Sequence, residues 1–189
     1  MDAIIHLVRC FESDKITHVN AEINPTADLE TIKTEIILSD IDIIQKKLEK
    51  GKKKLLSEKE VTILEKKLEL LDQGNDEAND DEIVNKFLSS IGLLSIKPKI
   101  IVCNVDETSL VTGNKFTESI KSKYPNEKIV SICADIEDQI MGLDKDERET
   151  FMKEIGLNKT GLNQLIKEGY ALLDLDTFFT SGPEESRAW

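Results

Sequence analysis

The sequence feature that most constrains the fold is the short apolar run at residues 100–103 (IIVC), in which β-branched side chains predominate. Pro98 precedes this run, and polar residues follow it from Asn104 onward. Such a run, without polar alternation, is typical of a strand buried on both faces, as in a parallel sheet covered by helices. In open α/β sheets the ligand lies beyond the carboxyl ends of the strands. The run therefore predicts an α/β domain with a binding site that begins near Asn104.

Two further segments fit the same kind of sheet. Residues 3–8 form an apolar run that predicts a buried strand near the start of the sequence. Residues 128–133 (KIVSIC) form another short β-rich run, and the helical spacing of Phe116, Ile120 and Tyr124 predicts a helix before it. Short buried strands that alternate with helices indicate a parallel sheet with right-handed crossovers.

A long helical segment separates the first strand from the second. Asn24 followed by Pro25 is a helix-start signal, and two sets of apolar residues then recur at helical spacing. These sets are Ile37, Ile41, Ile44 and Leu48, and then Val61, Leu64, Leu68 and Leu71. The lysines at 52–54 interrupt the pattern, and Ser57 with Glu60 has the form of a capping box that starts the second helix. The pattern predicts an antiparallel helical hairpin with a coiled-coil seam, either a packing element or an arm that binds a partner.

The chain is therefore expected to divide into two parts. Residues 1–24 and 95–189 would make the α/β domain, and residues 25–94 would be a helical insertion. After the third strand, residues 134–155 are predicted to be helical with one break, and a last helix is predicted near residues 162–170.

The polar residues after the central strand are candidate binding residues. Asn104 and Glu107 make an Asn-x-x-Glu sequence, in which the amide can brace the loop and the carboxylate can accept hydrogen bonds from ring donors. Most nucleoside triphosphatases with such sheets have Asn-Lys-x-Asp at this place, and the Asp pairs with guanine. Taken alone, a four-residue sequence of this kind is more often an acidic turn than a binding motif, so both interpretations stay open.

Two other stretches begin like phosphate or base motifs but do not complete them. Gly156 and Gly161 have the glycine spacing of a phosphate-binding loop, but no Lys and hydroxyl follow, and they lie between predicted helices. Asn114 and Lys115 begin like Asn-Lys-x-Asp, but Thr117 stands where the acid is needed. No nucleophile–base pair stands out, so the sequence indicates no catalytic residue for phosphoryl transfer.

Composition sets the broad class of protein. The 189 residues are 39% hydrophobic and 33% charged, and the net charge of −12 argues against simple wrapping of nucleic acid. Cys10, Cys103 and Cys133 lie in apolar runs and are interpreted as buried, reduced thiols of a cytosolic protein. No Cys/His cluster suggests a metal site, and His6 and His18 are too isolated to assign. The sequence contains no signal peptide and no apolar run long enough to span a membrane.

Several long stretches carry a resemblance to one family, in the family's own order: DAIIHLVRCFE, KPKIIVCNVDE, VSICADIE, LDKDERETFMKEIGL and GLNQLIKEGYALLDLDTFFTSGPEESRAW. With the helical hairpin, they resemble the YchF branch of the Obg-related P-loop nucleotidases. The resemblance implies a partial parallel-sheet α/β nucleotidase domain with an inserted antiparallel coiled-coil hairpin. That family has NxxE in place of NKxD, prefers ATP over GTP, uses Mg²⁺, and is associated with ribosomes in the cytoplasm.

Carried over by motif, the resemblance implies that Asn104, Val105 and Glu107 line the pocket for the nucleotide base. Cys133 and Ala134 match the family's second base-contacting loop. The family's P-loop, switch regions and DxxG motif have no counterpart here, so no residue maps to its phosphate and Mg²⁺ ligands. The family's C-terminal TGS domain would begin around residues 187–189. The sequence is thus expected to correspond to the middle of such a protein.

Two hypotheses follow. In the first, the chain is a truncated or split YchF-type ATP- or GTP-binding protein that keeps base recognition and is inactive alone; in the split case a separate chain carries the P-loop half. In the second, it is a non-enzymatic module whose coiled coil binds the ribosome or another partner. In both, the strand at residues 3–8 lacks the P-loop strand as its neighbour. Its exposed edge is therefore expected to cause self-association.

Overall fold

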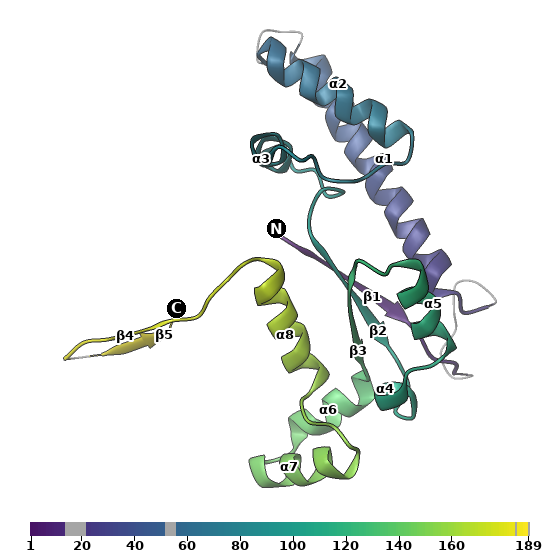
Figure 1. Cartoon of the computed structure of the whole chain (residues 1–189), viewed down its shortest axis with the longest axis vertical. Helices are drawn as coiled ribbons and strands as arrows, with labels where there is room; N and C mark the ends of the chain where they lie inside the picture. Colours follow the sequence, from purple (N-terminus) through teal and green to yellow (C-terminus); the bar gives the residue numbers. More distant parts are fainter. Residues whose placement is uncertain (14–21, 52–55, 184, 189) are drawn as a thin grey trace. The chain divides into compact units, whose positions relative to one another are not determined.

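The computed structural model describes residues 1–13, 22–51, 56–183 and 185–188 (Figure 1). The chain divides into two compact units, one made of Met1–Ile23 with Pro98–Trp189 and the other of Asn24–Lys97. His18 and the lysines at 52–54 lie outside the described residues.

The first unit is built on a three-stranded sheet, whose strands are β1 (Ile4–Arg9), β2 (Lys99–Asn104) and β3 (Lys128–Ile132). The order is β1-β2-β3, and both pairs are parallel. The predicted parallel α/β sheet is therefore confirmed, and the apolar run at residues 100–103 forms its central strand. All four residues of that run are buried, because β2 has a strand on each side and helices near both faces.

Helices connect and cover these strands. They are α4 (Ser109–Thr112), α5 (Lys115–Lys123), α6 (Ala134–Gly142), α7 (Lys145–Glu154) and α8 (Gly161–Leu172). Figure 1 shows α5 and α8 on opposite sides of the sheet. Leu165 and Leu172 of α8 pack against a core cluster of Ile100, Val102 and Val130. The predicted break in the helix at residues 134–155 is also present, because Asp144 caps α7 and so separates it from α6.

The prediction that β1 is buried is wrong for one of its faces. Ile5 is 56% exposed and Leu7 is 61% exposed. By strand register they lie level with Ile100 and Val102, on the face that α8 covers. Because α8 contacts β3 and β2, the part of this face on β1 stays open among the described residues.

The second unit is helical and consists of α1 (Pro25–Gly51), α2 (Glu58–Asp72) and α3 (Glu82–Ser90). The capping box predicted at Ser57 is present, since Ser57 and Glu60 bond each other's backbone N–H groups. The fully buried side chains of its core come from all three helices and the residues after them: Ile44, Leu64, Leu71, Leu88 and Leu93. That α1 and α2 form a coiled coil stays a prediction.

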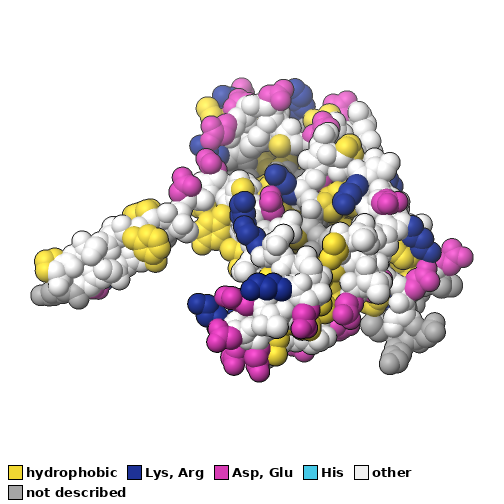
Figure 2. Space-filling view, turned by 60° about the horizontal axis from the view of Figure 1, so that its bottom comes forward, with side chains coloured by type: hydrophobic (Ala, Val, Ile, Leu, Met, Phe, Trp, Pro, Cys, Tyr) yellow, Lys and Arg dark blue, Asp and Glu magenta, His cyan; other side chains and the backbone are white. Residues whose placement is uncertain are grey.

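A short hairpin near the end of the chain was not predicted. β4 (Phe179–Ser181) pairs antiparallel with β5 (Ser186–Ala188). Figure 2 shows this hairpin as an arm with apolar side chains on its surface, and Phe178 and Phe179 are among the exposed ones. Three-residue strands leave too short a pattern to recognise in the sequence.

Candidate functional site

The candidate site lies where parallel strands β2 and β3 end side by side. β2 ends at Asn104, and β3 ends at Ile132, just before Cys133 and Ala134. The Asn104 Oδ1 atom accepts a hydrogen bond from the backbone N–H of Ala134 at 3.1 Å. The backbone N–H of Val105 donates to the Ile132 carbonyl at 2.8 Å. The Asn104 amide therefore joins the two loops, as expected for an amide that braces a binding site.

The loop after β2 is held by its own acidic residue. The Asp106 carboxylate accepts hydrogen bonds from the Thr108 hydroxyl and from the backbone N–H and hydroxyl of Ser109. These hydrogen bonds lower the pKa of Asp106, because they stabilise its charged form. Val105 is 2% exposed, whereas Glu107 is exposed. The loop therefore buries its apolar residue and leaves the Glu107 carboxylate at the surface.

These loops border a pocket of about 400 Å³. It is lined by Phe11, Glu12, Ser13, Asn104, Val105, Asp106, Glu107, Ala134 and Asp135. Of the five residues selected from the sequence, it brings together Asn104, Val105, Glu107 and Ala134. Cys133 is not among the lining residues. It is buried, and burial raises the pKa of its thiol, with the nearby carboxylates of Asp135 and Glu107 adding to the effect.

The residues at the end of β1 were missed by the sequence reasoning. Phe11, Glu12 and Ser13 follow β1 directly and form one wall of the pocket. A usable signal was present, because β1 was predicted as a parallel strand of the same sheet. Its carboxyl end must then lie at the same edge as those of the other strands.

The glycines at 156 and 161 and the stretch that begins at Asn114, both incomplete as nucleotide-binding motifs, include residues with structural roles. The Gly161 N–H donates to Glu137 Oε1 at 2.6 Å, and a Cβ at Gly161 would lie 2.7 Å from the Ile132 side chain. Close packing of α8 on β3 thus accounts for this glycine. Asn114 caps α5 and accepts hydrogen bonds from the Phe116 and Thr117 N–H groups.

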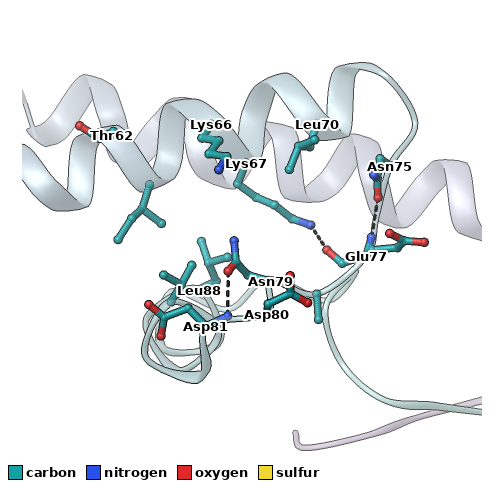
Figure 3. A pocket seen from close by; sticks show the side chains of 13 residues that line it. Thr62, Lys66, Lys67, Leu70, Asn75, Glu77, Asn79, Asp80, Asp81 and Leu88 are labelled. Atoms are coloured by element: carbon teal, nitrogen blue, oxygen red, sulfur yellow. Dashed lines mark hydrogen bonds between the residues drawn. The ribbon is translucent and has the colours of Figure 1, made fainter.

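A second pocket, of about 480 Å³, lies in the helical unit between α2 and the segment that leads into α3 (Figure 3). Lys67 Nζ donates to the Glu77 carbonyl at 2.7 Å, and Asn75 Oδ1 accepts from the Glu77 N–H. Asn79 Oδ1 accepts from the Asp81 N–H in the same way. These side chains hold the loop in its fold, which accounts for the polar groups that Figure 3 shows there.

In the described ranges, no group of three or more His, Cys, Asp or Glu side chains is arranged to hold a metal ion. No described helix is both long and apolar enough to cross a membrane. Cys10, Cys103 and Cys133 are all buried and form no disulfide.

Comparison with known proteins identifies the family. The Ribosome-binding ATPase YchF of Escherichia coli O157:H7 is 36% identical over 200 residues, which cover 100% of this chain and 54% of that protein. The protein of the same name from Bacillus subtilis is 36% identical over 202 residues, with 55% of its length covered. The chain belongs to the YchF family. No protein-family profile matches the chain.

The fold agrees with this assignment. The structure of the Schizosaccharomyces pombe YchF GTPase superimposes with a TM-score of 0.84 at 27% identity, covering 100% of this chain and 54% of that one. The resemblance seen in the sequence is therefore confirmed. This chain spans about half the length of the YchF relatives it matches.

Proposed function

We propose that this chain supplies the base-binding part of a YchF-type site for ATP or GTP. The observation that carries the proposal is the Asn104–Ala134 hydrogen bond, which joins the loops after β2 and β3 beside a pocket that contains Glu107. The names of its relatives, an ATPase and a GTPase, support a nucleoside triphosphate as the ligand. Mg²⁺ would accompany the phosphates, and its ligands would lie in the P-loop half of such a protein.

The side chains in the pocket favour adenine. Glu107 can accept a hydrogen bond from the N6 amino group of adenine, and the Phe11 ring offers an aromatic surface for stacking. Val105 stands where guanine-specific sites have Lys. The longer Glu side chain makes the usual paired acceptance from guanine unfavourable. Cys133 would support the pocket from beneath Ala134 rather than contact the base.

Base contacts alone make this a weak site. Each hydrogen bond to the base contributes roughly 0.5–1.5 kcal/mol. After the cost of immobilising the ligand, a net binding free energy of about 4 kcal/mol would remain, which corresponds to roughly millimolar affinity. The phosphates would approach a chain of net charge −12, which opposes them. No described residue has been identified that could cradle the phosphates or position a water. We therefore infer that the chain alone does not hydrolyse ATP.

The open face of the sheet supports a partner that carries the P-loop half. Leu165 and Leu172 of α8 pack on the sheet, whereas Leu162, Ile166 and Tyr170 of the same helix are exposed. Ile5 and Leu7 are also exposed, and they lie on the face of the sheet that α8 covers only over β2 and β3. A strand added beside β1 and a helix laid over it would bury these groups.

The helical unit supports a second role for the same protein. Relatives of this chain are named ribosome-binding. We infer that α1 and α2 form an inserted arm within residues 25–94 that docks on the ribosome in the cytoplasm. An arm of this kind would act with or without nucleotide. Deleting it should therefore abolish ribosome co-sedimentation while leaving base binding intact.

Calorimetric titration with ATP and GTP tests the main proposal. The chain combined with the P-loop half of a family member should bind ATP more tightly than GTP, and V105K with E107D should move the preference toward GTP. Equal affinities in the unmodified complex would refute the base assignment. Micromolar ATP affinity of the chain alone, or ATP hydrolysis that is lost in E107A, would refute the inference that phosphate chemistry lies elsewhere.

A further inference from the structure

The wall of the pocket formed by Phe11, Glu12 and Ser13 is attached to the rest of the domain at several points. We call these three residues the Phe11 loop. The loop begins just after β1, where the Cys10 N–H donates to the Asn104 carbonyl at 2.7 Å. The attachments come from two directions, one within β1 and one from α5. Both hold the loop that carries Phe11 at the border of the pocket.

Arg9, the last residue of β1, binds the Phe11 loop through one guanidinium group. Its Nε donates to the Phe11 carbonyl at 3.1 Å, and its Nη2 donates to the Ser13 carbonyl at 3.3 Å. The same guanidinium lies over the Phe11 ring, with its central carbon 4.9 Å from the ring centre. Arg9 therefore fixes both the backbone of the loop and the position of the aromatic side chain.

The beginning of α5 holds the loop from the other direction. Asn114 Nδ2 donates to the Cys10 carbonyl at 2.7 Å, while the Oδ1 atom of the same amide caps α5. Lys115 Nζ lies 2.7 Å from the Glu12 carboxylate. The stretch that begins like Asn-Lys-x-Asp thus lies at the edge of this site. Its side chains bind the chain's own loop.

We propose that Arg9 and Asn114 are positioning residues that hold Phe11 for stacking against the nucleotide base. This inference rests on the proposed function of the pocket. A base stacks more strongly on an aromatic ring that is already fixed, since ordering the ring on binding costs free energy. The two residues act through Phe11.

The test is ligand-observed NMR titration of the full chain with adenosine, which carries no phosphate charge. Adenosine is the ligand of choice because Arg9→Gln also removes a positive charge, and that loss would by itself weaken the binding of ATP. Arg9→Gln should weaken adenosine binding about tenfold, the effect expected for losing one stacked base contact. Arg148→Gln is the matched control, because Arg148 donates to the Leu143 carbonyl beside α7 and should leave binding unchanged.

A second variant separates positioning from folding. Asn114→Asp keeps the oxygen atoms that cap α5 but loses the N–H donor to the Cys10 carbonyl. It should therefore weaken adenosine binding while the melting temperature changes by little.

A double-mutant cycle shows whether Arg9 acts through Phe11. In a Phe11→Ala background, Arg9→Gln should have no further effect on adenosine affinity. Unchanged affinity in Arg9→Gln, or fully additive losses in the cycle, would overturn this inference alone. Failure of the unmodified chain to bind adenosine at millimolar concentration would overturn the proposed function and this inference with it.

Discussion

The two compact units differ in how completely they cover their own apolar side chains. In the helical unit, Ile44, Leu64 and Leu71 are buried by residues of the same unit. In the sheet unit, Ile5 and Leu7 of β1 are more than half exposed, although their neighbours on β2 are buried. Helices that pack together can bury their apolar stripes against one another, whereas a sheet face needs a covering layer as wide as the sheet. Here α8 covers β2 and β3.

The largest expected effect is a loss of stability in the helical unit. Leu64→Ala should lower the free energy of unfolding by about 2–5 kcal/mol, because Leu64 is fully buried and its removal leaves a cavity. The matched change Leu7→Ala should cost less than about 0.5 kcal/mol, because Leu7 is exposed. Urea unfolding followed by circular dichroism measures both. Equal losses would show that the face around Leu7 is covered in solution.

Asp40 should make the next largest contribution, again within the helical unit. Its carboxylate is fully buried and accepts hydrogen bonds from the Leu94 and Ser95 N–H groups at 2.8–3.1 Å. Asp40→Ala should destabilise by about 2–3 kcal/mol, since it leaves these buried donors unpaired. Asp40→Asn keeps one acceptor oxygen and should cost less. A larger loss in Asp40→Asn than in Asp40→Ala would contradict this role.

The open face of the sheet unit leads to a prediction about association. The chain alone should self-associate or be poorly soluble, because β1 is an edge strand of the sheet among the described residues and carries exposed Ile5 and Leu7. Co-expression with the P-loop half of a family member should restore a soluble complex. Ile5→Lys combined with Leu7→Lys should reduce self-association and also prevent that complex from forming. Light scattering that finds the unmodified chain to be a stable monomer at high concentration would contradict the prediction.

The smallest expected effect concerns His6 on β1. Burial lowers its pKa from the ordinary value of about 6.5, and the Lys99 charge adds to this effect. Because the unfolded chain binds the proton more readily, His6 should cost no stability above pH 6.5. Stability should fall as the pH decreases from there toward the lower pKa of the folded state. His6→Gln should flatten stability in that pH window, and thermal melts at several pH values would measure the change.

The candidate site was predicted in part. One predicted strand was enough to place three of the pocket residues at the end of the sheet, because they lie within four positions of one another: Asn104, Val105 and Glu107. Ala134 was selected from the resemblance to the YchF family, and the parallel pairing of β2 with β3 brings it beside Asn104. Phe11 was not predicted although its strand was, because an aromatic side chain directly after an apolar run is ordinarily part of the core.

The sequence by itself determined the elements whose signals are local. Apolar runs and helical spacing lie within about ten to fifteen residues, so they predicted the three parallel strands and the breaks between helices. Tertiary structure alone decided which faces are covered and which side chains meet. Ile5 and Val102 are both apolar strand residues, yet one is 56% exposed and the other 1%, because only Val102 lies under α8. Likewise, Asn114 and the Cys10 carbonyl are 104 positions apart, and only packing of α5 beside the end of β1 brings them into contact. Local patterns record the propensity of a segment, whereas burial and long-range hydrogen bonds depend on segments far away in the chain.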